Sequence, residues 1–234
     1  PGAATTRMAA PPSVRHDPPP AWVPNWVSSW FICNSEYTWM LMCAAVEGAD
    51  TVVLPAVFAD IAKDFAVSPK SLGTLTMVRG LLQALSSPLA GFAADKYDRR
   101  RLVAWGSVIW GAATAAMAAS PSFLFLFTLR AVNGIGLGLV PPLVAGYVAD
   151  SFHASNHGKA FGLLGLLIGL GSAIGGLAAT IIAGVPSIPG WRLALLLIAI
   201  LSIFAALALF SAIRSDDGLG EERGGGGDEG AAPE

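Results

Sequence analysis

The segment at residues 91–101, GFAADKYDRRR, is a short charged stretch between two long apolar runs. Backbone polar groups cannot be left unpaired in hydrocarbon, so a charged turn at this place marks a point where the chain returns to water. It therefore separates two segments that each cross a membrane. The composition agrees, because 54% of the residues are hydrophobic and only 13% are charged, too apolar for a soluble domain. We expect an integral, multi-pass membrane protein.

Apolar runs on both sides of this turn are long enough to cross about 30 Å of hydrocarbon as helices. The six runs lie at about residues 38–58, 71–92, 102–119, 123–148, 160–183 and 193–213. They show no alternation with a period of two, which favours helices over the strands of a β-barrel. The sequence therefore predicts an all-α membrane protein with a six-helix transmembrane bundle over residues 37–214.

Two segments of different composition flank the bundle. Residues 1–36 are rich in Pro and Ala, and Trp22, Trp26 and Trp30 lie just before the first run. This pattern predicts a disordered tail followed by an interfacial segment, since Trp favours the headgroup level. Residues 215–234 combine many glycines with acidic side chains, the composition of a flexible linker. Because the chain starts at Pro1 and stops just after this tract, we interpret it as a fragment.

The basic residues near the ends of the runs predict the orientation in the membrane. If the N-terminus is cytoplasmic, the inner side holds Lys96, Arg99, Arg100, Arg101, Lys159 and Arg214, and the outer side holds Lys63, Lys70 and Arg192. Cytoplasmic loops carry the excess of Lys and Arg. We therefore expect both ends of the bundle, and the acidic linker, on the cytoplasmic side. The sequence does not indicate which membrane.

The spacing Gly-x-x-x-Asp-Lys-x-x-Arg-Arg in the charged turn resembles the signature loop of the major facilitator superfamily of secondary transporters. In that family the loop lies between the second and third helices, which is the place of this turn. The resemblance implies the N-terminal six-helix half of such a transporter. It also implies a gating loop, with Asp95 as its central acid and Gly91, Lys96, Arg99 and Arg100 around it. The alternative, that the arginines only follow the positive-inside rule, does not require Gly91 and Asp95.

Asp98 stands where the family usually has a second glycine. Glycine takes φ > 0 more easily than Asp, so the tightness of this turn is an open question. At the inner end of the fourth run, Asp150 matches an acid that joins the gating loop in relatives.

Other stretches also resemble parts of the family. Residues 130–134, RAVNG, resemble the Arg-x-x-x-Gly motif of the fourth helix, whose arginine is tied to proton transfer in proton-coupled members. Residues 171–176, GSAIGG, resemble the antiporter motif Gly-Pro-x-x-Gly-Gly, but Ser172 replaces its proline, so close helix packing is the better interpretation. Residues 47–50 and 189–192 are similar to plant and algal relatives of the spinster-like lipid transporters.

Four ionisable side chains lie inside the runs: Glu47, Asp50, Arg79 and Arg130. A rise of about 1.5 Å per residue places the last three about 10 to 12 Å from the outer ends, with Glu47 nearer the midplane. Intramembrane charges mark substrate or coupling sites. We expect Asp50 to pair with Arg79 or Arg130, and Glu47, with less compensation, to carry the coupling proton. The alternative is a static salt-bridge cluster that only orders the helices.

Other classes of protein fit the residues less well. An intramembrane serine protease needs Gly-x-Ser-Gly and a histidine inside a span, but Ser172 is not followed by glycine and the three histidines lie outside the runs. His153 and His157 have no clear third ligand for a metal ion. The basic residues do not form a nucleic-acid footprint. We therefore expect that the protein is not an enzyme and that it binds no cofactor, no metal ion and no nucleic acid.

The family resemblance implies secondary active transport of a small solute by alternating access, coupled to protons as symport or antiport. The expected partners are a small-molecule substrate, a proton, the lipid bilayer, and either a missing C-terminal half or a second copy of this chain. The alternative is a receptor or scaffold that keeps the fold without transport.

Overall fold

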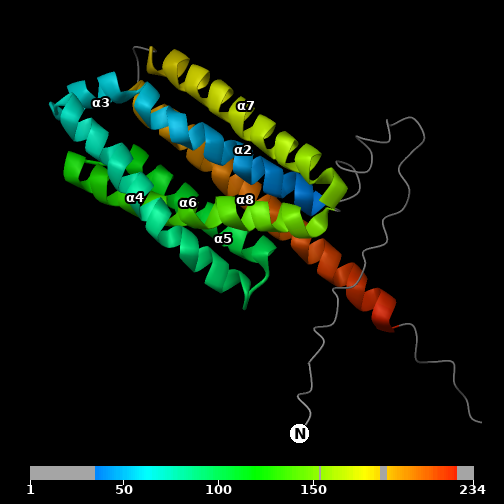
Figure 1. Cartoon of the computed structure of the whole chain (residues 1–234). Helices are drawn as coiled ribbons and strands as arrows, with labels where there is room; N and C mark the ends of the chain where they lie inside the picture. The colour runs from blue at the N-terminus through cyan, green and yellow to red at the C-terminus, as the bar shows by residue number, and fades with distance from the viewer. Residues whose placement is uncertain (1–34, 153, 185–188, 226–234) are drawn as a thin grey trace, which may run out of the picture. The chain divides into compact units, whose positions relative to one another are not determined.

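The computed structural model describes residues 35–152, 154–184 and 189–225. The elements in these ranges are all helical (Figure 1). They are α2 (Ser35–Ala56), α3 (Phe58–Phe65), α4 (Pro69–Ala94), α5 (Arg99–Ala118), α6 (Phe123–Ser151), the 3₁₀ turn η1 (Ala154–Asn156), α7 (His157–Ala183) and α8 (Gly190–Gly225). The prediction of an all-α fold is confirmed. The segment with Trp22, Trp26 and Trp30 lies outside the described residues.

Each of the six apolar runs overlaps one long helix, namely α2, α4, α5, α6, α7 and α8. By length and composition, four helices in the described part can cross a membrane: α2, α6, α7 and residues 190–215 of α8. The other two, α4 and α5, have 26 and 20 residues but carry more polar and charged side chains, so six spans stay a prediction. At its C-terminal end α8 extends through Gly225, into the segment whose composition predicts a flexible linker, because a formed helix propagates easily.

Capped, short turns connect several of these helices. Ser68 and Ser122 are the N-cap residues of α4 and α6, where their hydroxyls accept from the N–H groups of Ser71 and Phe125. The short helix α3 ends at Phe65, and its C-cap residue Ala66, whose φ of 50° is left-handed, reverses the chain before α4. These turns bring consecutive helices back across the bundle.

Close backbone contacts join the helices that carry the intramembrane charges. The helix α6 packs along both α4 and α5, and α5 packs along α8. At Gly134 a Cβ atom would lie 2.5 Å from the backbone oxygen of Arg79, so only glycine permits this approach of α6 to α4. On the other side of the bundle α7 lies along α2, where Gly171 touches the backbone of Ala45 (Figure 1).

A buried apolar cluster fills the bundle around α3. It joins residues of α2, α3, α4, α5, α6, α7 and α8, among them Leu54, Ile61, Leu75, Met117 and Leu126. Trp191, at the start of α8, is 1% exposed and donates from Nε1 to Asp64 Oδ2 at 2.6 Å. This cluster separates the charged side chains in the middle of α2 from the α3 end of the bundle.

Candidate functional site

Asp50 lies at the centre of a buried charged cluster. Its Oδ2 atom is 3.1 Å from Arg130 Nη1 on α6 and 4.0 Å from Arg79 Nε on α4. Asp50 and Arg130 are each 1% exposed. Buried charges are stable only when they are paired and hydrogen-bonded. The two arginines compensate the free-energy cost of burying the Asp50 carboxylate. Asp50 thus lies within ion-pair distance of both arginines that the sequence offers as its alternative partners.

Two neutral polar side chains complete the buried end of the cluster. Asn133 Oδ1 accepts from Arg130 Nη1 at 3.2 Å, and Asn133 Nδ2 donates to Thr114 Oγ1 at 2.9 Å. The Thr114 hydroxyl lies 3.0 Å from the Trp110 carbonyl and 3.4 Å from Asp50 Oδ1. Neither residue was among the site residues predicted from the sequence. Asn133 lies three positions after Arg130 and thus on the same helix face, whereas Thr114 is one of two hydroxyl residues in α5, with Ser107.

Glu47 forms the less buried end of the cluster. Its Oε1 atom is 3.8 Å from Arg79 Nη2, and its side chain is 13% exposed, compared with 0% for that of Asp50. The same Arg79 Nη2 donates to Thr51 Oγ1 at 3.0 Å. Glu47 therefore has one distant cationic partner among the described residues, whereas Asp50 has two.

Both arginines keep an unused hydrogen-bond donor. The Nε atoms of Arg79 and Arg130 are buried and have no hydrogen-bond acceptor in the part of the chain that the structure describes. The cluster contains two carboxylates and two guanidinium groups, so its charge balances only when both acids are ionised. Addition of one proton would leave one positive charge in excess.

The turn between α4 and α5 is held by ion pairs to other helices. Arg99 Nη1 pairs with Asp150 Oδ2 at the end of α6. Arg100 binds Asp98 through Nη2 at 2.8 Å, and its Nη1 lies 2.6 Å from Glu36 Oε1 on α2. Glu36, which the sequence places at the end of the N-terminal tail, is 4% exposed in the first turn of α2. The turn thus connects the ends of α2, α5 and α6.

Asp98 is the N-cap residue of α5. Its φ and ψ are −60° and 122°, a conformation open to any residue, so the turn does not need glycine here. Its Oδ1 atom accepts from the Arg100 N–H at 2.9 Å. Burial tends to raise the pKa of Asp98, but the hydrogen bonds and charge of Arg100 outweigh this effect and hold the pKa below its usual value. The open question about the tightness of the turn is answered by this cap.

The other residues of the expected gating loop are arranged differently from the expectation. Asp95 and Lys96 are exposed, and neither forms an ion pair within the described residues. The Cβ position of Gly91 faces open space. Arg99 binds Asp150, the acid expected to join this loop, whereas Arg100, expected beside Asp95, binds Asp98 and Glu36. Arg100 pairs with Asp98 because the two residues are only two positions apart at the start of α5.

His157 also binds backbone. Its Nε2 atom lies 3.1 and 2.8 Å from the carbonyl oxygens of Ala149 and Phe152, at the end of α6, and must therefore donate. In the part of the chain that the structure describes, no group of three or more His, Cys, Asp or Glu side chains could hold a metal ion, and His153 lies outside the described ranges.

A family model, that of the Major Facilitator Superfamily, matches residues 40–232. The chain belongs to this superfamily. It is an integral, multi-pass membrane protein, and its relatives are transporters rather than enzymes.

This superfamily member is similar to two bacterial proteins. It is 28% identical over 151 residues to the niacin transporter NiaP of Acinetobacter baylyi. This match covers 64% of this chain and 34% of that protein. It is 29% identical over 123 residues to the quinolone resistance protein NorA of Staphylococcus aureus. This match covers 51% of this chain and 32% of that protein. The chain thus spans about a third of the length of these relatives.

Solved structures of superfamily members share the fold. A bacterial homolog to the human lysosomal transporter Spinster, in an inward-facing and occupied conformation, superposes with a TM-score of 0.69 at 20% identity. The match covers 75% of this chain and 43% of that one. A D-xylose-proton symporter superposes with a TM-score of 0.62 at 18% identity, over 75% of this chain and 47% of that one. The chain corresponds to the N-terminal half of the superfamily fold.

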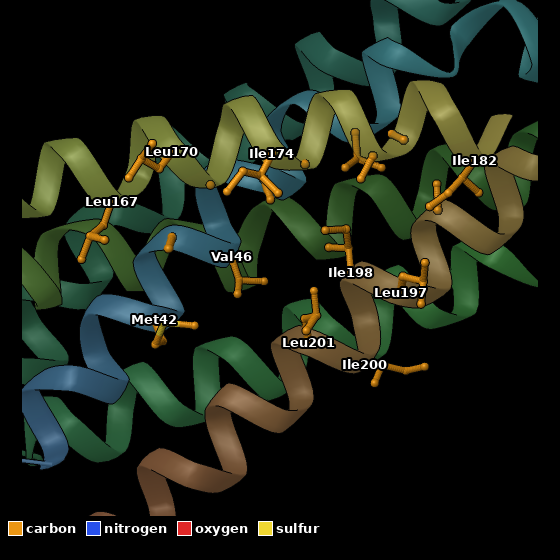
Figure 2. Close-up of a pocket in the computed structure, with 18 residues that line it drawn as sticks. Met42, Val46, Leu167, Leu170, Ile174, Ile182, Leu197, Ile198, Ile200 and Leu201 are labelled. Carbon is orange, nitrogen blue, oxygen red and sulfur yellow. The ribbon is translucent and has the colours of Figure 1, made fainter. Parts of the chain in front are cut away.

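A separate apolar groove lies on this superfamily member between α2, α7 and α8. Figure 2 shows its lining, which consists of 18 residues with apolar side chains or none, including Val46 on α2, Ile174 on α7 and Leu201 on α8. The groove has a volume of about 490 Å³. It contains none of the charged residues of the Asp50 cluster, so the polar site and the apolar groove are distinct.

Proposed function

We propose that this chain forms the N-terminal half of a proton-coupled transporter that moves a small solute by alternating access. In this proposal α2, α4, α5, α6, α7 and α8 cross the membrane over residues 37–214, with both ends in the cytoplasm. Residues 1–36 then form a tail with an interfacial Trp segment, and residues 215–234 lead toward the C-terminal half or a second copy of the chain. Membership of the superfamily and the likeness to proton-coupled structures support this proposal.

The observation that carries the coupling proposal is the unequal environment of the two acids. Asp50 lies between two guanidinium groups and accepts a hydrogen bond from Arg130 at 3.1 Å, so its carboxylate has two cationic partners. Glu47 has one cationic partner, Arg79 at 3.8 Å, and the neutral Gln83 beside it, and it lies nearer the surface of the described chain, so a proton can reach it. We therefore assign the coupling proton to Glu47, and a fixed, structural ion pair to Asp50 and Arg130.

Protonation of Glu47 changes the force between two helices. While Glu47 is ionised it attracts Arg79, so α2 and α4 are held together at this level. Once Glu47 is neutral, Arg79 keeps Asp50 at 4.0 Å and the Thr51 hydroxyl as its neighbours. A proton that binds one conformation better than the other shifts the equilibrium toward it, which is the requirement for coupled transport.

The turn between α4 and α5 is proposed as the gating loop. Its arginines join α5 to Asp150 on α6 and to Glu36 on α2, so ion pairs connect these three helix ends. Asp95 and Lys96 stay exposed, and we propose that they meet the other half of the transporter. Gly91 lies next to this exposed end of α4 and leaves room for that contact.

Uptake by the full-length protein in proteoliposomes tests the function. The names of the two relatives motivate nicotinate and a fluoroquinolone as the first solutes, each measured with an imposed pH gradient. We expect Glu47→Gln to abolish gradient-driven accumulation while exchange of internal for external solute continues, and Glu47→Asp to retain part of the accumulation. The matched control is Asp60→Asn on α3, which removes an acid outside the cluster.

Two outcomes contradict this proposal. Full gradient-driven accumulation by Glu47→Gln would show that the cluster only orders the helices. A receptor or scaffold with the same fold would bind solute without accumulating it, so saturable binding without uptake by the wild-type protein would favour that alternative.

A further inference from the structure

The charge balance of the cluster limits what can bind beside it. With both acids ionised, the two carboxylates neutralise the two guanidinium groups. When Glu47 takes up its proton, one positive charge is left in excess in a poorly solvated region, where uncompensated charge is costly. A stable protonated state therefore needs one further negative charge from outside the cluster.

Arg79 is the guanidinium that can accept this charge. Arg130 is fixed by Asp50 at 3.1 Å and by Asn133 at 3.2 Å. The Nε atoms of both arginines lack a hydrogen-bond acceptor among the described residues, but Arg79 lies farther from its acids, at 3.8 and 4.0 Å, and is therefore the less tightly held of the two. The side chain of Arg79 is 8% exposed, so this free donor is buried rather than solvated.

The geometry also defines the side from which a ligand reaches Arg79. The backbone of Arg79 is pressed against Gly134 of α6, which fixes the base of the side chain. The apolar cluster around Leu54 and Leu75 fills the bundle toward α3. Thr51, which accepts from Arg79 Nη2, is exposed, and Glu47 beside it is partly exposed. The open side of the cluster is therefore the one lined by Glu47 and Thr51.

We propose that Arg79 binds the carboxylate, or a similar oxyanion group, of a monovalent anionic substrate, and that it does so when Glu47 is protonated. The assignment rests on the proposed transport function, because it names the substrate class of the same site. A guanidinium presents paired donors that match an oxyanion. One proton on Glu47 and one monoanion on Arg79 leave the total charge of the cluster at zero, so the two are carried together without net charge movement.

The groups around Glu47 indicate that the binding of one anion is linked to the uptake of one proton. Asp50 is on its own helix, Arg79 and the neutral Gln83 approach from α4, and Arg130 lies behind Asp50 on α6. From α5 the cluster receives the neutral Thr114, and α7 packs on α2 through Ile168, Gly171 and Gly175. Glu47 is thus the one carboxylate at the open side of the described cluster, and its proton is the one linked to anion binding.

Binding to the purified full-length protein tests the assignment without relying on transport. Affinities for benzoate and for neutral benzamide are measured in detergent at constant ionic strength across a pH series. We expect benzoate to bind and benzamide to bind far more weakly, with the benzoate Kd rising by about tenfold per pH unit above the titration of Glu47. The Glu47→Gln protein should bind benzoate with a Kd that no longer changes with pH in this range.

Variants of Arg79 distinguish a specific anion site at this residue from nonspecific electrostatic attraction of benzoate to the protein. Arg79→Gln should raise the benzoate Kd by about 10- to 100-fold, and Arg79→Lys by less, since a charged hydrogen bond is lost in the first case and kept in the second. Lys63→Gln is the matched control, because its ammonium is 79% exposed on α3 and should leave the Kd unchanged.

The outcomes for binding and for transport are distinguishable. Equal affinities for benzoate and benzamide, or benzoate binding that Arg79→Gln leaves intact, would overturn the anion site even if the protein accumulates a solute. In proteoliposomes, benzoate-specific accumulation that depends on the membrane potential would overturn the charge balance. Anion binding by the wild-type protein without any accumulation would uphold the site and count against the transport function.

Discussion

Asp50 Oδ2 and Arg130 Nη1 lie 3.1 Å apart between α2 and α6, and neither side chain is more than 1% exposed. Loss of either partner leaves a buried charge without its counterion, which typically costs about 3 to 5 kcal/mol. We expect Asp50→Asn and Arg130→Gln each to destabilise the protein strongly, and the double variant to be more stable than the sum of the two effects. Unfolding in detergent, followed as a double-mutant cycle, measures the coupling, and strictly additive losses would contradict it.

Replacement by alanine should change the stability in opposite directions at Gly134, which contacts Arg79, and at Gly165, which has open space around it. A Cβ at Gly134 would meet the Arg79 carbonyl oxygen at 2.5 Å, so Gly134→Ala must push α6 from α4 and should destabilise by about 1 to 3 kcal/mol. At Gly165 on α7 a Cβ meets nothing within 4 Å, and Gly165→Ala should stabilise the helix by about 0.5 to 1 kcal/mol. Thermal unfolding of both variants in detergent checks the signs. Equal effects at the two sites would argue against the close approach.

The Arg99–Asp150 pair should affect conformation more than stability. The side chains are 35% and 69% exposed, and ion pairs at such exposure contribute less than about 1 kcal/mol. We expect Arg99→Asp to change the reactivity of a cysteine placed at Lys96 toward a membrane-impermeant thiol reagent. The reversed pair, Arg99→Asp with Asp150→Arg, should restore the original reactivity. A double variant that behaves like the single one would show that the pair does not hold the turn.

The cap at Asp98 predicts a dependence of stability on pH. Because the pKa of Asp98 is lowered in the folded protein, its carboxylate stabilises the fold fully at pH values above the ordinary range near 4. This contribution is lost as the pH falls through the lower, folded value. At neutral pH Asp98→Ala should cost about 1 kcal/mol, with Asp95→Ala, at the exposed end of the same turn, as the control. Denaturant unfolding of both variants at neutral and at acidic pH measures the difference, which should shrink in acid.

Much of the helix arrangement could be predicted because apolar length is a direct requirement of the bilayer. The six runs correspond to the six long helices, and the charged turn lies between α4 and α5. The break that makes α3 a separate helix was not predicted, because Pro55 and Val57 lie inside an unbroken apolar run and the change of direction depends on tertiary contacts.

Depth along a helix could be estimated from the sequence, but the direction of each side chain could not. The four intramembrane charges were selected from their depth, and the structure brings Asp50, Arg79 and Arg130 together with Glu47 at one side. Thr114 and Asn133 were missed because a neutral polar residue in an apolar helix gives no indication of its partner. The partner of Arg100 was also missed, since Glu36 is distant in sequence and sits in a segment that composition alone assigns to a tail.

The apolar groove between α2, α7 and α8 also affects how α7 is attached. Along α2 the helix α7 is held by backbone contacts at Gly171 and Gly175 and by the hydrogen bond from Ser172 Oγ to the Gly48 carbonyl at 2.8 Å. Toward α8 the apolar groove separates part of α7 from its neighbour (Figure 2). The close backbone contacts of α7 therefore lie on its α2 side, and the side that faces α8 is the less tightly packed one.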